Sequence, residues 1–202
     1  MIPAVILAAG ASTRMGRPKA LLPISRDGET FLARVLRTMA DAGSDDLVVV
    51  LGAYADGVAE AIGRLPILAR VVENRAYARG QLSSLVTGLD LVDRPGVRAV
   101  VVMPVDMPLV SVATVRAVIA GYEHATPLVA RPARGRRHGH PVIFDRRLFG
   151  ELRGADSSRG VRPIIAAHLD RVLDVQVDDP GAFEDIDTPE DYERYIGLPL
   201  DI

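Results

Sequence analysis

The stretch from residue 3 to residue 19 reads PAVILAAGASTRMGRPK and joins an apolar run to a loop of small and basic residues. The run from Pro3 to Leu7 is short and apolar, which predicts a buried first strand. Small residues in the loop let backbone N–H groups approach a ligand closely, and Arg14 and Lys19 add the positive charge that phosphates attract. The loop therefore predicts a phosphate-binding turn at the end of this strand.

This loop does not follow either of the two commonest phosphate-binding patterns. Gly10 and Gly16 are too widely separated for GxGxxG, and no GxxxxGK[ST] can be drawn through the loop. The mismatch argues against a dinucleotide-dependent dehydrogenase and against a P-loop NTPase. The alternative interpretation is a solvated turn between strand and helix, in which the basic residues are incidental.

Outward from this loop, short apolar runs alternate with segments of helical periodicity. The alternation predicts an α/β fold with a Rossmann-like, doubly wound and mainly parallel sheet. The expected strands are 3–7, 47–51, 69–72, 99–103, 128–130, 141–144 and 172–177. The expected helices are 30–42, 55–62, 81–91, 111–119 and 161–168, with one more starting at residue 188.

Length and composition predict one folded domain with one main site. The chain has 202 residues, of which 49% are apolar and 25% charged, and these values are typical of a globular protein. No internal repeat, low-complexity tract or linker interrupts the sequence. We therefore expect residues 1–202 to form a single domain, with 126–158 as an insertion or lid on the same core.

Charge and residue types exclude several classes of protein. The formal net charge is −2 without a long block of like charge, so neither nucleic acid nor a membrane surface is expected as a partner. The absence of cysteine excludes disulfides, thiolate metal sites and thiol nucleophiles. The first apolar run follows no charged segment and is too short for a signal peptide or a membrane span. We expect a cytoplasmic protein with a small-molecule partner.

Two acidic residues stand where ligands of α/β proteins bind. Asp106 follows the most hydrophobic strand expected in the second half of the chain, which places it at the carboxyl edge of the sheet. Asp187 directly precedes the expected start of the last helix. Mg²⁺ binds few carboxylates because it keeps waters and takes phosphate oxygens. The alternatives are a turn aspartate between two prolines for Asp106, and an acid stabilised by a helix N-terminus for Asp187.

Three strings in the sequence resemble motifs of one family, the MobA-like NTP transferases. LAAGASTRMGRPKALLP at 7–23 is similar to the family's signature, PVDMP at 104–108 to its metal-binding motif, and DIDTPEDY at 185–192 to its C-terminal motif. The resemblance implies a fold of the nucleotide-diphospho-sugar transferase type. It also implies an Mg²⁺-dependent enzyme that transfers a nucleoside monophosphate from an NTP to a phosphorylated acceptor.

The same resemblance implies roles for individual residues. Arg14 and Lys19 match the cations that contact the triphosphate, and together with Asp106 they are the expected catalytic residues. Asp106 and Asp187 match the metal ligands, and Asp185 is the alternative for the second position. The expected nucleotide-binding residues are Leu7, Ala8, Ala9, Gly10, Ser12, Arg14, Lys19, Asn74, Gly80, Ser83 and Ser84.

The last four of these belong to residues 74–85, which are similar to the family's NxxxxxGxxxSL segment beside the nucleotide. A glycine turn followed by hydroxyls near a helix N-terminus suits contacts to an anion or a base. The alternative interpretation is that Ser83 and Ser84 merely cap the helix.

The acceptor side is expected in the second half of the chain. GHPVIF at 139–144 resembles the acceptor-side motif of the molybdenum cofactor cytidylyltransferase branch, and RGVR at 159–162 resembles that branch's GAR segment. The resemblance implies that His140, Arg159 and Arg162 contact an anionic pterin phosphate. Asp156 to Ser158 depart from the branch's pattern and leave the acceptor open. The arginines between residues 131 and 137 form a solvated face in our interpretation.

The resemblance to the same branch also implies which nucleotide and which partners the protein binds. Ala9 before Gly10 is similar to the cytidylyl-transferring enzymes and favours CTP over GTP. The expected reaction moves CMP from CTP to the phosphate of molybdenum-loaded molybdopterin, and transient contact with a molybdoenzyme or its chaperone is expected as well. The alternatives are a sugar or alcohol phosphate as the acceptor, and a nucleotide-binding accessory protein that does not catalyse transfer.

Overall fold

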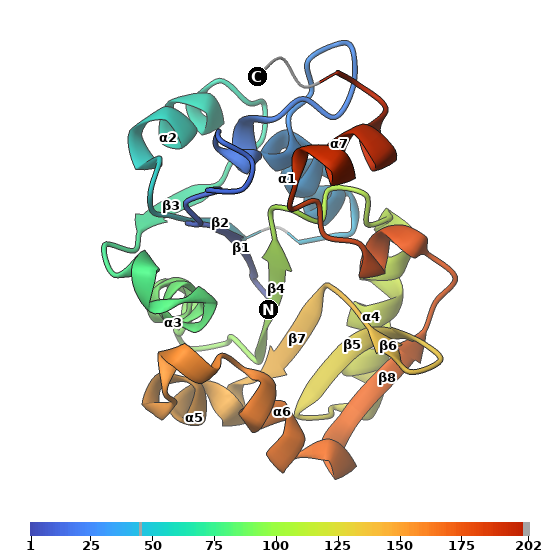
Figure 1. The fold of residues 1–202 in the computed structure, drawn as a ribbon. Helices are drawn as coiled ribbons and strands as arrows, with labels where there is room; N and C mark the ends of the chain where they lie inside the picture. The colour runs from blue at the N-terminus through green and yellow to red at the C-terminus, as the bar shows by residue number, and fades with distance from the viewer. Residues whose placement is uncertain (45, 200–202) are drawn as a thin grey trace.

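The computed structural model describes residues 1–44 and 46–199, and its centre is an eight-stranded sheet flanked by helices (Figure 1). The strands lie in the order β3-β2-β1-β4-β7-β5-β6, and β8 pairs with β5. β1 to β4 pair in parallel, whereas β7 runs antiparallel to both β4 and β5. The strands are β1 (Ala4–Ala8), β2 (Leu47–Leu51), β3 (Arg70–Glu73), β4 (Ala99–Pro104), β5 (Val129–Arg134), β6 (Arg137–His138), β7 (Val142–Asp145) and β8 (Val172–Gln176).

Polar side chains fix the start of several helices. Thr30 Oγ1 accepts a hydrogen bond from the Ala33 N–H, and Ser111 Oγ accepts one from the Thr114 N–H, so each satisfies a donor that the helix leaves free. Within the described residues, no helix has the length and hydrophobicity needed to cross a membrane. The α-helices are α1 (Phe31–Asp41), α2 (Ala55–Gly63), α3 (Gln81–Val92), α4 (Val112–Ala125), α5 (Phe149–Gly154), α6 (Arg162–Ala167) and α7 (Pro189–Ile196).

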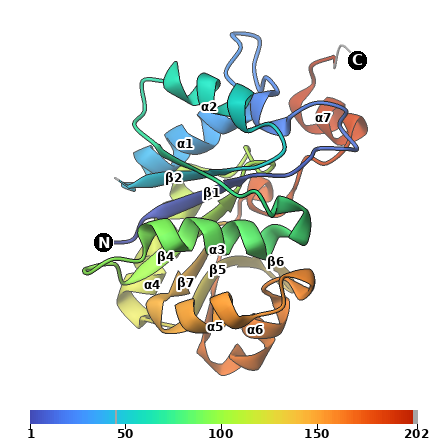
Figure 2. The same cartoon turned by 90° about the vertical axis from the view of Figure 1, so that its left-hand side faces the viewer.

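The helices cover both faces of the sheet and bury two hydrophobic layers (Figures 1 and 2). On one face, α1, α2 and α4 pack against alternate strand residues such as Ile6, Val49 and Val101. On the other face, α3, α5 and α6 pack against the intervening residues, among them Val5 and Val50. Both faces of the central strands are therefore buried, which explains why these strands are continuous apolar runs in the sequence.

The predicted α/β class and mainly parallel sheet are confirmed, and the differences are local. α4 extends to Ala125, beyond the expected end at residue 119, and α5 was not predicted. α5 has six residues and includes Gly150 and Gly154, which lower helix propensity. Residues 126–158, expected as an insertion or lid, contain β5, β6, β7 and α5, and the three strands hydrogen-bond within the one sheet.

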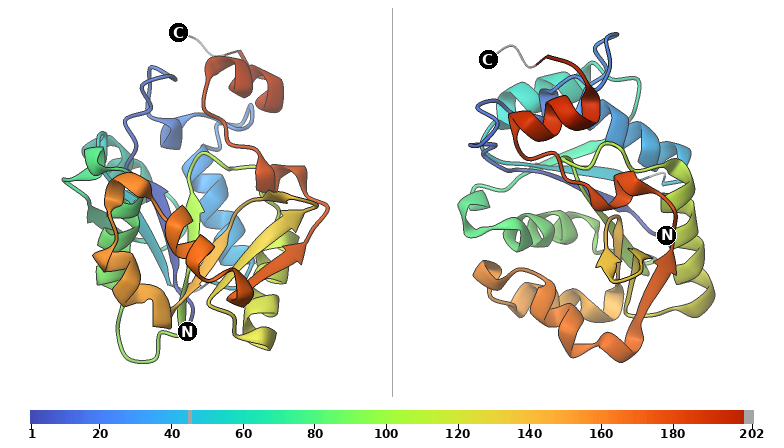
Figure 3. Two further views of the ribbon diagram at one scale, coloured as in Figure 1. Left: turned by 60° about the horizontal axis from the view of Figure 1, so that its bottom comes forward. Right: turned by 45° about the vertical axis from the view of Figure 1, so that its right-hand side comes forward.

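The C-terminal helix α7 packs against the loop that follows β1 (Figure 3). Tyr192 is fully buried, stacks on Phe31 with ring centroids 6.0 Å apart, and donates a 2.7 Å hydrogen bond to the Pro23 carbonyl. Thr188 and Asp191 form a capping box at the start of the helix. These contacts hold Asp187, which immediately precedes the cap, close to the loop after β1.

Candidate active site

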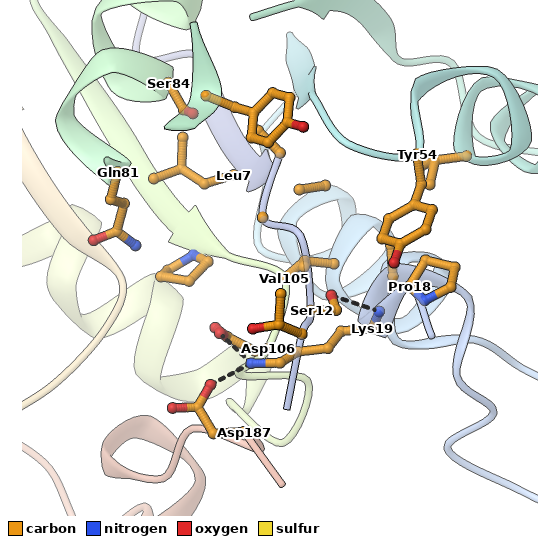
Figure 4. A pocket seen from close by; sticks show the side chains of 18 of the residues that line it. Leu7, Ser12, Pro18, Lys19, Tyr54, Gln81, Ser84, Val105, Asp106 and Asp187 are labelled. Carbon is orange, nitrogen blue, oxygen red and sulfur yellow. Dashed lines mark hydrogen bonds and ion pairs between the residues drawn. The ribbon is translucent and has the colours of Figure 1, made fainter. Parts of the chain in front are cut away.

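A cavity of about 320 Å³ lies at the carboxyl ends of β1 and β4 (Figure 4). This is the edge of the sheet at which open α/β proteins bind their ligands. Asp106 and Asp187 both line the cavity. Of the residues expected at the nucleotide, those that line it are Leu7, Ala8, Ala9, Gly10, Ser12, Arg14, Lys19, Gly80 and Ser84.

The loop after β1 is held in a tight conformation. Ser12 has a φ of 49°, in the left-handed region that residues with a side chain rarely adopt. Its carbonyl accepts hydrogen bonds from the Met15 and Gly16 N–H groups, and its Oγ accepts one of 3.1 Å from the Lys19 N–H. Tyr54 Oη donates to the Ala11 carbonyl at 3.2 Å. The loop is thus fixed by its own hydrogen bonds and by Tyr54, the residue before α2, as a rigid phosphate-binding turn requires.

Lys19 lies between the two acids at the floor of this cavity (Figure 4). Its Nζ donates to Asp106 Oδ2 at 3.1 Å and also to Asp187 Oδ1, while Arg14 donates to Asp187 Oδ2 at 2.7 Å. Only 11% of the Lys19 side chain is exposed, against 64% for Arg14. The Lys19 ammonium is therefore a nearly buried charge that needs its carboxylate partners.

Two opposing effects act on the pKa of Asp187. Burial raises it, but the hydrogen bond and positive charge of Lys19, assisted by Arg14, outweigh burial and hold the pKa below its ordinary value. Asp187 is therefore ionised at neutral pH. Its carboxylate carries the negative charge that a divalent cation needs.

A backbone hydrogen bond determines which of Asp185 and Asp187 lies beside Asp106. The Ile186 N–H donates to the Asp106 carbonyl at 2.9 Å, which ties the two segments together. Asp187 then lines the cavity with Asp106, whereas Asp185 acts electrostatically on His140. The geometry therefore brings Asp106 and Asp187 together at the cavity, which Asp185 does not line.

Two carboxylates are a suitable protein contribution to a Mg²⁺ site. Among the residues that the structure describes, no cluster of three or more acidic or histidine side chains is placed to hold a metal. Mg²⁺ commonly takes one or two carboxylates and completes its coordination with water and substrate phosphates. The pair Asp106 and Asp187 fits that pattern, because both already share one cation at the cavity floor.

Not all of the residues expected beside the nucleotide reach the cavity. Asn74 is buried, and its Nδ2 donates to Ser83 Oγ at 2.9 Å and to Ser84 Oγ at 3.0 Å. Ser83 Oγ donates in turn to the Gly80 carbonyl at 2.7 Å, and no side chain caps α3. Asn74 and Ser83 do not line the cavity, and their contacts shape the turn before α3 instead. The helix-capping alternative for the two serines is not what the structure contains.

Of the three expected acceptor residues only His140 lines a cavity, although Gly160 and Val161, which stand between Arg159 and Arg162, line the same one. His140 lines a second, smaller cavity of about 40 Å³, whereas Arg159 and Arg162 line neither cavity. Burial lowers the pKa of His140 to about 4, although the charge of Asp185 acts to raise it. His140 is therefore uncharged at neutral pH and cannot hold a phosphate by charge.

Comparison with known proteins identifies the family. The sequence matches the MobA-like NTP transferase domain over residues 4–172. The chain belongs to this family. Nicotine blue oxidoreductase of Paenarthrobacter nicotinovorans is 32% identical, and the alignment covers 95% of this chain and 95% of that protein. Molybdenum cofactor guanylyltransferase of Xanthomonas euvesicatoria pv. vesicatoria is 29% identical, over 95% of this chain and 93% of that protein.

A solved structure supports the same assignment. Rv0371c from Mycobacterium tuberculosis H37Rv, in complex with manganese, superposes with a TM-score of 0.78 at 33% identity, covering 97% of this chain and 98% of that one. The predicted family and the nucleotide-diphospho-sugar transferase type of fold are thereby confirmed.

Four residues of this MobA-like transferase, among them Val58 of α2, line the cavity but carry no signal in the motifs. Tyr77 and Gln81 occupy variable positions of the segment before and within α3, so the motif gives no reason to select them. Tyr54 follows β2, the parallel neighbour of β1, and loops at the carboxyl ends of adjacent strands share one ligand site. That rule alone would have found Tyr54.

His140→Asn is expected to reduce the pH dependence of stability below pH 6.5. The pKa of His140 is about 4 in the folded protein and near 6.5 when unfolded, so the unfolded chain binds a proton that the folded chain does not. The stability that the wild type gains from a neutral His140 is complete above pH 6.5 and is lost as the pH falls toward 4.

Urea unfolding across this pH range measures the effect. The free energy of unfolding should fall more steeply with decreasing pH in the wild type than in His140→Asn. His124 is exposed on α4, so His124→Asn is the matched control and should keep the wild-type slope. Equal slopes for all three proteins would show that His140 titrates normally.

Proposed function

We propose that this protein moves CMP from CTP to the phosphate of molybdenum-loaded molybdopterin, with Mg²⁺, and releases pyrophosphate. The observation that supports the proposal most strongly is the position of Lys19 between Asp106 and Asp187, beside the loop after β1. Cation, carboxylates and loop amides converge within one cavity, which is the combination that a metal-bound triphosphate requires.

The loop after β1 and its cations hold the triphosphate in this proposal. Backbone N–H groups between residues 9 and 14 hold the phosphates, since those of Met15 and Gly16 donate to the Ser12 carbonyl, and Arg14 and Lys19 neutralise the phosphate charge. When the triphosphate binds, the Lys19 ammonium pairs with phosphate oxygens and leaves the Asp106 and Asp187 carboxylates to the metal ion. The metal ion supplies further neutralisation of the charge on the phosphates.

The chemical step needs positioning rather than a covalent intermediate on the protein. An oxygen of the acceptor phosphate forms a bond to the α-phosphorus of the nucleotide, the bond from that phosphorus to the bridging oxygen breaks, and pyrophosphate leaves with the electron pair. The acceptor phosphate is already an anionic nucleophile, so no general base is required of His140. The protein's own part is to align the two substrates and stabilise the charge on the leaving group.

One of the two relatives supports nucleotidyl transfer by its name, whereas the other is named an oxidoreductase, and the choices of acceptor and nucleotide rest on fewer observations. The Xanthomonas relative is named for guanylyl transfer to the molybdenum cofactor, which supports molybdopterin as acceptor. The manganese complex of the mycobacterial protein supports a divalent cation. CTP rests on Ala9 before Gly10, since the guanylyl branch tends to have two glycines there.

The nucleotide preference is tested by thermal unfolding with each NTP and Mg²⁺. Only a ligand that prefers the folded state raises the melting temperature, so CTP should raise it more than GTP, ATP or UTP. A pyrophosphate assay with molybdenum-loaded molybdopterin, sugar phosphates and alcohol phosphates then identifies the acceptor. A larger shift with GTP would overturn the choice of CTP, and nucleotide binding without pyrophosphate release under any acceptor would favour the non-catalytic alternative.

A further inference from the structure

The cavity with the acids and the smaller cavity with His140 meet at one side chain that no motif selects. Leu7 and Gln81 line both the cavity with the acids and the second cavity with His140. Gln81 is the first residue of α3, and its carboxamide points into the first cavity in Figure 4. A reaction that joins a nucleotide in the first cavity to a molecule seated in the second therefore takes place beside Gln81.

The second cavity is suited to an uncharged group. Its walls are mainly apolar, with Leu85, Val102 and Phe144 among them, and within the described residues no Asp, Glu, Lys or Arg lines it. His140 contributes a neutral imidazole there, because burial lowers its pKa to about 4. A sugar, with hydroxyls around the ring, would leave several of them without partners against such walls.

The turn before Gln81 is closely packed, whereas the Gln81 side chain is available to bind a ligand. The preceding Gly80 has a φ of 104°, and a Cβ added there would lie 3.2 Å from the Ser157 carbonyl oxygen, so the turn is packed on that side. In the part of the chain that the structure describes, the Gln81 carboxamide makes no hydrogen bond to the protein. Its donor and acceptor are both free for a ligand.

We propose that Gln81 is a specificity-determining residue for the acceptor. Its carboxamide donates one hydrogen bond and accepts another along the edge of an uncharged heteroaromatic ring, where an N–H stands beside a C=O. A carboxamide presents a donor and an acceptor side by side, and the same geometry lets glutamine bind the edge of adenine. This inference rests on the proposed function and adds to it the residue that recognises the ring of the acceptor.

Steady-state kinetics of Gln81→Leu test this role, with Gln176→Leu as the matched control. Leucine has a similar volume but no hydrogen-bonding group, and Gln176 is exposed on β8, outside both cavities. The KM for molybdenum-loaded molybdopterin should rise about tenfold in Gln81→Leu, the effect of losing one or two neutral hydrogen bonds. The Kd for CTP should stay within about twofold, because in this proposal the Gln81 carboxamide bonds to the acceptor and not to the nucleotide. The control should match the wild type.

A binding measurement separates this inference from the proposed function. The fluorescence of 6-hydroxymethylpterin, which has the lactam edge but no phosphate, is titrated with protein in the presence of CTP and Mg²⁺. Binding that weakens about tenfold in Gln81→Leu supports the inference even if no pyrophosphate is released, in which case the proposed transfer alone is wrong. Pyrophosphate release with unchanged acceptor KM and unchanged pterin binding in Gln81→Leu would overturn the inference alone. A higher Kd for CTP with an unchanged acceptor KM would also overturn it, because Gln81 would then read the nucleotide.

Discussion

Asp106→Asn is expected to lower kcat for nucleotidyl transfer by about 10²- to 10³-fold, the usual effect of removing one group that stabilises transition-state charge. Asparagine keeps the shape of the side chain and an oxygen for the Lys19 ammonium, but it removes the negative charge that a divalent cation requires. Asp106 is partly exposed at the cavity floor, and Lys19 keeps Asp187 as a partner, so the fold should persist.

Pyrophosphate release at saturating substrates, together with circular dichroism, checks this expectation. Asp178 is an exposed aspartate that pairs with Arg134 away from the cavity, so Asp178→Asn is the matched control and should retain wild-type kcat. Near-normal turnover in Asp106→Asn would remove Asp106 from the mechanism.

Lys19→Met is expected to have two measurable effects, because Lys19 serves both the fold and the triphosphate. Lys19 is the only lysine in the sequence, in a chain that otherwise uses arginine for its basic side chains. Without it, Asp106 and Asp187 lose the cation that they share, although Arg14 still pairs with Asp187, and we expect a stability loss of about 1–2 kcal/mol without divalent cations. Mg²⁺ should restore more stability to the variant than it adds to the wild type, since the ammonium no longer competes for the carboxylates.

The loss of activity in Lys19→Met should also reach about 10²-fold, because a phosphate contact is lost along with the charge. Lys19→Arg is the discriminating variant. A guanidinium is a planar fork that does not fit the nearly buried space of a compact ammonium, so most of the loss should remain despite the retained charge. Melting curves with and without Mg²⁺, and a pyrophosphate assay, measure both effects. Full activity in Lys19→Met would exclude a role at the triphosphate.

Much of the fold was predictable because the strands of the parallel half of the sheet have a clear hydrophobic pattern in the sequence. β1, β2 and β4 are continuous apolar runs, since both faces of each strand are buried. The direction of β7 was not predicted, although the connection from β5 is too short for a parallel crossover. α5 escaped prediction because six residues with two glycines give almost no periodic signal.

The residues of the candidate site were likewise predicted only in part. The loop after β1 and Asp106 were expected at one edge of the sheet because the carboxyl ends of parallel strands meet there. A motif does not say whether a side chain faces the ligand or supports the turn behind it, so Asn74 and Ser83 were expected in the cavity and lie outside it. Gln81 was missed for the converse reason, since its position depends on the packing of α3 and not on its residue type.

A crystal structure with Mn²⁺ and a CTP analogue whose α,β-bridging oxygen is replaced by CH₂ tests the central claim most directly. Anomalous scattering locates the metal independently of the protein geometry. We expect one peak between Asp106, Asp187 and the phosphates, with Lys19 Nζ moved from the carboxylates onto phosphate oxygens. A triphosphate bound elsewhere, with Lys19 still between the two acids, would contradict the account.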